Sequence, residues 1–245
     1  GLLGPNGAGK TTTIGIITGL VNLTSGSVKV MGNDVIKDYK KTRKLIGLSP
    51  QELNFDVFFP IKDVLALNAG YYGLSNKDAY ERANIMLEQF GLIDKANNTA
   101  RELSGGMKRR VQIAKALVHN PEILILDEPT AGVDIELRHM LWSYLKEINN
   151  DGKTIILTTH YIEEAEEIAD RVGIINKGKI ILVDEKDNLI KKLGQKMLKI
   201  ELTYPIENIP SALSDFNLEL NDEKDILTYI YDTKGKNTGI TSFLF

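Results

Sequence analysis

The chain opens on a glycine-rich segment that restricts its possible folds more than any other feature. Residues 4–11 read Gly-Pro-Asn-Gly-Ala-Gly-Lys-Thr and fit the pattern G-x-x-x-x-G-K-[ST] at every defined position. Glycines let the backbone curl so that successive N–H groups point inward at an anion, and the helix that follows adds its positive end. We therefore predict a phosphate-binding loop that links a β-strand to a helix.

The spacing also predicts what this loop contacts. We expect Lys10 to reach the β- and γ-phosphates of a nucleotide and Thr11 to offer its hydroxyl to Mg²⁺. A dinucleotide-binding fingerprint is excluded, because no third glycine completes a G-x-G-x-x-G pattern. The residues predicted to bind the nucleotide in this segment are Gly4, Pro5, Asn6, Gly7, Ala8, Gly9, Lys10, Thr11 and Thr12.

Strands and helices alternate through the first two-thirds of the chain. Apolar runs predict strands at 28–31, 45–48, 123–126, 154–159 and 172–175. Apolar residues at helical spacing predict helices at 11–20, 62–90, 104–119, 135–149 and 162–169. This alternation favours an α/β fold with a parallel sheet covered by helices and with ligands at the carboxyl ends of the strands.

Composition excludes several classes of function. The 245 residues, at about 150 per domain, allow one large domain with an appendage. The 30 basic and 33 acidic residues give a net charge of −3, so we expect no global attraction to nucleic acid. The absence of cysteine excludes disulfides, thiolate zinc sites and thiol catalysis. No stretch approaches the ~18 apolar residues of a membrane span and no signal peptide opens the chain, so we expect a soluble, cytoplasmic protein.

A second chemical feature is an apolar run that ends in two carboxylates. Residues 123–128 read Ile-Leu-Ile-Leu-Asp-Glu, which is typical of a buried parallel strand. Such a strand would bring Asp127 beside the phosphate loop to hold Mg²⁺, and Glu128 would polarise the attacking water as a general base. Two acids at a strand end mean little alone, but together with the phosphate loop they indicate phosphoryl transfer.

A second helix start also has the features of an anion site. Residues 103–107 read Leu-Ser-Gly-Gly-Met before a helical pattern, so Ser104 and the glycine amides can bind phosphate. An LSGG segment followed by the Asp-Glu strand is typical of one family. The chain resembles the ATP-binding subunits of ABC transporters over residues 1–190. It most resembles those of ABC-2 type exporters, in the segments SGGMKRRVQIAKAL, LDEPTAGVDIELR and TTHYIEEAEEIADRVGIINKGKI.

The resemblance implies roles for further residues. Gln51 matches the family's glutamine that contacts Mg²⁺ and the attacking water, and His160 matches the switch histidine that contacts the γ-phosphate. Asp134 matches a residue near the dimer interface. The implied catalytic residues are Glu128, His160 and Gln51, and the implied metal ligands are Thr11, Gln51 and Asp127. Ser104, Gly105, Gly106 and Asp134 join the phosphate loop in binding ATP.

The resemblance also implies a domain organisation. Residues 1–51 and 120–193 would form a P-loop NTPase core, a RecA-like parallel sheet with helices on both faces whose first strands are missing. Residues 52–119 would form a helical subdomain that carries the LSGG signature. Residues 194–245, where alternating stretches at 198–202 and 226–231 appear, would form a small and incomplete α+β appendage. We expect the adenine-stacking residue to lie upstream of residue 1.

Two partners follow from the resemblance. Two ATPase subunits would close head to tail, so that Ser104, Gly105 and Gly106 of one chain bind the ATP held by Lys10 of the other. A membrane-spanning permease would anchor them at the cytoplasmic face of the cell membrane, and ATP hydrolysis would drive export. The alternative is a soluble ABC-type ATPase acting on nucleic acid or ribosomes. The interval between Thr11 and Leu103 disfavours it, because it holds neither cysteines for a zinc module nor the heptads of a coiled coil.

Three segments lie outside these motifs. Residues 54–60, Asn-Phe-Asp-Val-Phe-Phe-Pro, either line a groove for a short helix of the membrane subunit or belong to the core of the helical subdomain. The basic cluster Lys-Arg-Arg at 108–110 is expected on the solvated face of its helix. The acidic residues between 163 and 167 are likewise expected to face solvent, while Ile162, Ala165 and Ala169 face inward.

Overall fold

The computed structural model describes residues 1–133, 135–193, 195–210, 213, 216 and 218–232. It divides into two compact units, Gly1–Val183 and Asp184–Phe245, so the division falls ahead of residue 194, where the composition shifts. In the described ranges, no helix has both the length and the apolar character needed to cross a membrane.

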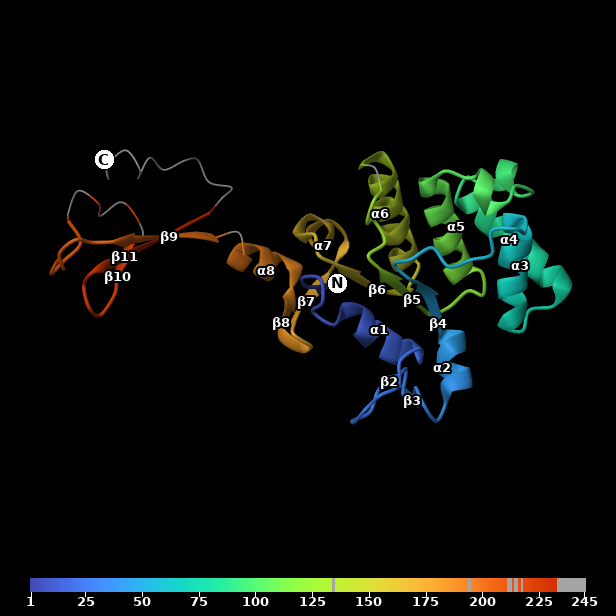
Figure 1. Ribbon diagram of the computed structural model, residues 1–245, viewed down its shortest axis with the longest axis horizontal. Coiled ribbons are helices and arrows are strands. Elements are labelled where there is room, and N and C mark those ends of the chain that lie inside the picture. The colour runs from blue at the N-terminus through green and yellow to red at the C-terminus, as the bar shows by residue number, and fades with distance from the viewer. Residues whose placement is uncertain (134, 194, 211–212, 214–215, 217, 233–245) are drawn as a thin grey trace. The chain divides into compact units, whose positions relative to one another are not determined.

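A six-stranded sheet forms the centre of the first unit (Figure 1). Its strand order is β4-β5-β6-β1-β7-β8, and the strands from β4 to β7 in that order pair in parallel. The predicted parallel sheet is therefore confirmed. The strands are β1 (Leu2–Leu3), β4 (Ile46–Ser49), β5 (Ile123–Asp127), β6 (Thr154–Thr159), β7 (Arg171–Asn176) and β8 (Lys179–Glu185).

Helices cover both faces of this sheet because the buried strand β5 is apolar on both sides. Leu124 and Leu126 pack in one cluster with residues of α5 (Gly105–Leu117) and α6 (Ile135–Asn150). Ile125 points the other way and packs in a second cluster with Ile14 of α1 (Lys10–Thr18). In Figure 1, α1 and α6 accordingly lie on opposite sides of β5 and β6.

A helical layer joins the sheet through α5. It contains α3 (Ile61–Tyr71) and α4 (Asn76–Gln89), where the sequence pattern predicts a single helical region. The chain breaks at Gly73, whose φ of +97° lies in the left-handed region that favours glycine. Ser75 then caps α4, since its hydroxyl accepts a hydrogen bond of 3.2 Å from the Asp78 amide.

Several short elements were not predicted, because they carry no regular apolar stripe. In α2 (Tyr39–Leu45), for example, the buried residue is Thr42 among charged neighbours. The other short elements that were not predicted are β3 (Asn33–Asp34), η1 (Ile93–Lys95) and η2 (Ala100–Glu102). The seven-residue strand β8 was also not predicted, although it contains an apolar run at 180–183. The predicted elements β2 (Lys29–Val30) and α7 (Ile162–Ile168) are present.

The second unit contains an unpredicted helix, α8 (Lys186–Leu193), and a three-stranded sheet in the order β10-β11-β9. Its strands β9 (Gln195–Glu201), β10 (Leu218–Leu220) and β11 (Ile226–Asp232) pair antiparallel. The two alternating stretches of the sequence correspond to the paired strands β9 and β11.

Gly47 in β4 allows α5 to approach the sheet closely. A Cβ at this position would lie 2.1 Å from the Ala116 carbonyl oxygen and 2.8 Å from the Pro121 ring. Gly47→Ala is therefore expected to lower the free energy of unfolding by about 1–3 kcal/mol, the usual cost of overpacking. Urea denaturation followed by circular dichroism measures this change.

Gly70 provides the matched control. It lies in α3, and a Cβ there would meet no heavy atom within 4 Å. Gly70→Ala should therefore raise the free energy of unfolding by about 0.4–1 kcal/mol. Equal stability of the Gly47→Ala variant and the parent chain would contradict the close packing of α5 on β4.

Candidate active site

The phosphate loop leaves β1 and enters α1 as predicted. Gly7 and Gly9 have φ of +78° and +104°, which other residues rarely adopt. A Cβ on Gly4 would lie 2.4 Å from the Ile175 carbonyl oxygen, so a side chain is excluded there as well. Gly9 occupies the N-cap of α1, and no side chain caps this helix start. The loop therefore has the backbone shape and the uncapped helix N-terminus that an anion needs.

Lys10 is buried at the centre of this loop. Only 5% of the residue is exposed. Its ammonium donates hydrogen bonds to the carbonyl oxygens of Gly4 at 2.8 Å and Pro5 at 3.3 Å. The same Nζ lies 3.1 Å from Oε1 of Glu128. The positive charge predicted to bind phosphates thus faces the predicted general base.

The carboxylate of Glu128 lies within 3.3 Å of three other predicted site residues, Lys10, Gln51 and His160. Gln51 donates from Nε2 to Oε2 of Glu128 at 3.2 Å, and Nδ1 of His160 lies 3.3 Å from Oε1. Together with Lys10, this brings residues from three distant segments of the sequence to the side chain of Glu128. Glu128 itself has φ of +47°, a conformation uncommon for a residue with a side chain.

Asp127 lies next to Glu128 and contacts the phosphate loop directly. The Thr11 hydroxyl donates to Oδ2 of Asp127 at 2.8 Å, and the Thr158 hydroxyl donates to Oδ1. Two predicted metal ligands, Thr11 and Asp127, are therefore in contact, while the third, Gln51, contacts Glu128.

A cavity of about 380 Å³ opens over these groups. Of the residues that the structure describes, its lining consists of Asn6, Gly7, Ala8, Gly9, Lys10, Thr11, Thr12, Gln51 and Glu128. Most of the predicted nucleotide-binding residues thus line one hollow together with two of the predicted catalytic residues.

The signature residues lie apart from this cavity. Ser104 caps α5, and its hydroxyl accepts a hydrogen bond of 3.3 Å from the Met107 amide. None of Ser104, Gly105 and Gly106 is among the described residues that line the cavity. Asp134, the remaining predicted site residue, lies outside the described residues.

Arg109 was wrongly predicted to face solvent, and only 6% of it is exposed. Burial lowers the pKa of its guanidinium, whereas the carboxylates of Asp127, Glu164 and Glu128 raise it. The residue belongs to the site, because its guanidinium donates to main-chain carbonyls around Glu128. Hydrophobic patterning cannot reveal such a residue, since its partners are main-chain carbonyls and the amide oxygen of Gln112 rather than apolar side chains.

Glu164 was also wrongly predicted to face solvent. It is 1% exposed, whereas Ile162, expected to face inward, is 47% exposed. The inward face of α7 is therefore turned towards Glu164 and Ala165. Oε1 of Glu164 accepts hydrogen bonds from the Thr130 hydroxyl at 2.9 Å and from the Trp142 indole at 3.5 Å.

Comparisons with known proteins agree with this geometry. The family model described as "ABC transporter" matches residues 1–131. The linearmycin resistance ATP-binding protein LnrL of Bacillus subtilis (strain 168) is 43% identical over 203 residues, which cover 83% of this chain and 65% of that protein. The Nod factor export ATP-binding protein I of Burkholderia lata is 40% identical over 201 residues, covering 82% of this chain and 66% of the relative. The chain thus spans about two thirds of the length of these curated relatives.

Solved structures give the same fold. The structure of an ATP binding subunit of an ABC transporter is 30% identical, with a TM-score of 0.70 over 79% of this chain and 80% of the other. A dimeric ATP-binding cassette in a post-hydrolysis state, bound to ADP and Pi, is 29% identical, with a TM-score of 0.69 over 76% and 84% of the two chains. The motifs, the fold and these relatives together establish that the chain belongs to the ABC transporter family and has the fold of its ATP-binding subunits.

Proposed function

We propose that the chain binds ATP with Mg²⁺ and hydrolyses it, as the motor subunit of an ABC-2 type exporter at the cytoplasmic face of the membrane. The observation that carries the proposal is the contact of the Glu128 carboxylate with Lys10, Gln51 and His160. A base, a phosphate-binding cation and two polar groups that can orient water and phosphate are what hydrolysis of a phosphoanhydride needs.

The residues fit the nucleotide and its metal ion. The loop amides and Lys10 would hold the phosphates in the cavity. Thr11, Asp127 and Gln51 would hold Mg²⁺, which neutralises charge on the phosphates when it is bound. Among the described residues, no three His, Asp or Glu side chains form a metal-binding group. The ion would therefore take its remaining ligands from phosphate oxygens and water, as Mg²⁺ commonly does.

Glu128 would act as the general base. Its carboxylate accepts a proton from water while the water oxygen forms a bond to the γ-phosphorus. The bond between that phosphorus and the β–γ bridging oxygen breaks, so the products are ADP and inorganic phosphate. Gln51 would orient the water and His160 would contact the γ-phosphate. Phosphate would also draw Lys10 away from Glu128, because both anions compete for one ammonium.

Glu128→Gln tests this assignment, because it keeps the shape of the side chain and removes the base. ATP hydrolysis should fall by about 10²–10⁴-fold while ATP binding persists. Phosphate release and titration with a fluorescent ATP analogue, both on the full-length protein, measure the two quantities. Glu163→Gln, a change on the exposed face of α7, is the matched control and should leave the rate unaltered. If the Glu128→Gln variant keeps more than about a tenth of the parent's hydrolysis rate, Glu128 is not the general base.

The position of the signature residues supports a dimer. Since Ser104, Gly105 and Gly106 do not line their own chain's cavity, they are free to bind the ATP of a second chain. One of the similar solved structures is itself a dimer of ATP-binding cassettes. We therefore place Ser104 of one copy at the γ-phosphate held by Lys10 of the other, with Asp134 near the interface.

Mixing two inactive variants tests this arrangement. A Lys10→Ala chain and a Ser104→Arg chain should each hydrolyse ATP slowly. In a head-to-tail dimer, however, the mixed pair contains one site with Lys10 and Ser104 both intact. The phosphate release of the mixture should therefore exceed the sum of the two separate rates severalfold. No gain on mixing, for variants shown to associate, would mean that the site is completed within one chain.

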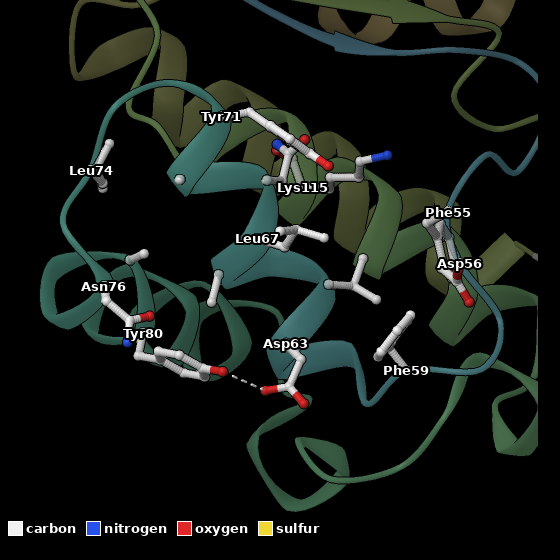
Figure 2. A pocket seen from close by; sticks show the side chains of 15 residues that line it. Phe55, Asp56, Phe59, Asp63, Leu67, Tyr71, Leu74, Asn76, Tyr80 and Lys115 are labelled. Atoms are coloured by element: carbon white, nitrogen blue, oxygen red, sulfur yellow. Dashed lines mark hydrogen bonds between the residues drawn. The ribbon is translucent and has the colours of Figure 1, made fainter.

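A groove on the helical layer supports a membrane partner. The cavity measures about 730 Å³, and α3, α4, α5 and the segment after Gln51 line it (Figure 2). Leu67 and Tyr71 of α3 project into it with 57% and 78% of their surfaces exposed. Phe58 and Phe59 are 68% and 54% exposed, which supports the groove, whereas Phe55 of the same segment packs partly buried against the hydrophobic core.

The lining fits an amphipathic helix. Figure 2 shows an apolar floor from Leu67 and Phe59, with Lys115 at one end and Asp63 hydrogen-bonded to Tyr80 at the other. The Tyr80 hydroxyl donates to Oδ1 of Asp63 at 2.9 Å. Apolar anchors with polar ends are the pattern of helix-in-groove recognition. We assign the groove to a short cytoplasmic helix of the permease, next to the Gln51 segment that senses nucleotide.

A charged residue introduced into the groove should prevent binding of the membrane protein without changing ATP hydrolysis by the isolated subunit. Leu67→Asp is expected to abolish co-purification with the proposed membrane-spanning permease, because the apolar helix would have to bury a carboxylate. Hydrolysis by the isolated subunit should stay within about twofold, since Leu67 lies outside the site. Ile93→Asp, at an apolar residue 44% exposed outside the groove, is the control that should still co-purify. Capture of nucleic acid in place of a membrane protein would favour the alternative function.

A further inference from the structure

We propose that Arg109 is a positioning residue that fixes the main chain of Glu128 and Gln51 to the signature helix α5. In the proposed dimer, Ser104 of this chain contacts the ATP held by the partner. Arg109 would thereby connect that ATP site to the ATP site of its own chain, which contains Glu128. The inference deepens the proposed function and rests on it, because it takes Glu128 as the base and Ser104 as a contact of the partner's ATP.

The first set of contacts fixes the backbone around Glu128. Arg109 Nε donates to the Pro129 carbonyl at 2.8 Å, and Nη2 donates to the Asp127 carbonyl at 3.4 Å and to the Glu128 carbonyl. These are consecutive carbonyls, and the middle one belongs to the residue with φ of +47°. One guanidinium therefore stabilises an uncommon backbone conformation that aims the Glu128 carboxylate at Lys10.

The second set of contacts fixes the segment of Gln51. Nη1 of Arg109 donates to the carbonyls of Pro50 at 3.1 Å and Gln51 at 3.0 Å. It also donates to Oε1 of Gln112 at 3.1 Å, one turn further along α5. Gln112 in turn donates from Nε2 to the carbonyls of Pro50 at 2.8 Å and Glu52 at 2.6 Å. The segment that carries Gln51 is thus bound to α5 through its main chain.

Lys115 continues the same row of donors along α5. Its ammonium donates to the Asn54 carbonyl at 2.8 Å. Arg109, Gln112 and Lys115 are spaced three residues apart, so they lie along one side of the helix. A shift of α5 would therefore move the chain from Pro50 to Asn54 with it. Arg109 alone of these three also contacts the main chain around Glu128.

The helix that carries Arg109 begins at the signature. Ser104 is the N-cap of α5, and Arg109 lies in the second turn. When Ser104 binds the partner's ATP, the start of α5 is fixed, and Arg109 transmits that position to Glu128 and Gln51. Only an arginine can make this link, because its planar fork directs donors to two separate segments, whereas a lysine offers a single point of donation.

Arg109→Lys tests the proposal in the full-length protein, because it keeps the charge and removes the fork. The kcat for ATP should fall by ~10- to 100-fold, the cost of a misplaced catalytic group, while the Kd for ATP stays unchanged. Arg110→Lys is the matched control. Arg110 lies on the same helix, but its Nη1 donates to the Phe90 carbonyl at 2.7 Å, inside the helical layer. The Arg110→Lys variant should keep kcat within about twofold of the parent value, even if its midpoint of thermal unfolding is lower.

A double-mutant cycle shows whether Arg109 acts through Glu128. Adding Arg109→Lys to Glu128→Gln should reduce the residual rate far less than it reduces the rate of the parent, because the group it positions is already lost. Additive losses would overturn the proposal, as would equal kcat in the Arg109→Lys and Arg110→Lys variants. A Glu128→Gln variant that retains activity would instead refute the proposed function itself.

A further variant covers the case in which Arg109→Lys does not fold. Gln112→Met keeps the length of the side chain but removes the acceptor for Arg109 and the donors to Pro50 and Glu52. Its kcat should fall severalfold with unchanged Kd for ATP. Unchanged kcat in Gln112→Met, together with an unfolded Arg109→Lys variant, would mean that Arg109 supports the fold alone, and the proposal would be wrong.

Discussion

The parallel pairing of four neighbouring strands is the constraint on which the rest of the site depends. In the register of the sheet, Leu3 pairs with Thr159, Asp127 with Thr158, and Ser49 with Leu126. The four strands therefore end at nearly the same level. The phosphate loop, Gln51, Glu128 and His160 each follow one of these ends within two residues. Short connections after the strands then bring together groups that are up to 156 residues apart in the sequence. The site needs no long flexible loop.

Much of this arrangement could be predicted from the sequence. The phosphate loop has a fixed spacing because the backbone must curl around an anion, so residues 4–11 alone indicate a strand, a loop and a helix. The apolar run at 123–126 indicates a buried strand. Asp127 and Glu128 directly after it indicate that the nucleotide binds at the carboxyl ends of the strands. The contact of Lys10 with Glu128 follows from these two predictions once the strands are parallel.

The residues that sequence analysis placed wrongly share a physical reason. The spacing of apolar residues along a helix assigns the charged residues to the solvent-exposed face. This assignment is correct only when water is the best hydrogen-bonding partner of the charged group. Arg109 finds its partners among main-chain carbonyls, and Glu164 finds them in Thr130 and Trp142. No apolar pattern records such partners, because they lie far away in the sequence. The break of the predicted helical region at Gly73 was missed because the segments on both sides of it carry apolar residues at helical spacing.

The left-handed backbone at Glu128 has a consequence for how this position can evolve. The position requires a residue that tolerates positive φ and also a carboxylate long enough to meet Lys10, Gln51 and His160. Glycine and asparagine meet the first demand and lack the charge, while aspartate has the charge on a shorter arm. Valine, isoleucine and threonine fail at the backbone itself. Few substitutions at this position would therefore keep both the backbone conformation and the contacts with Lys10, Gln51 and His160.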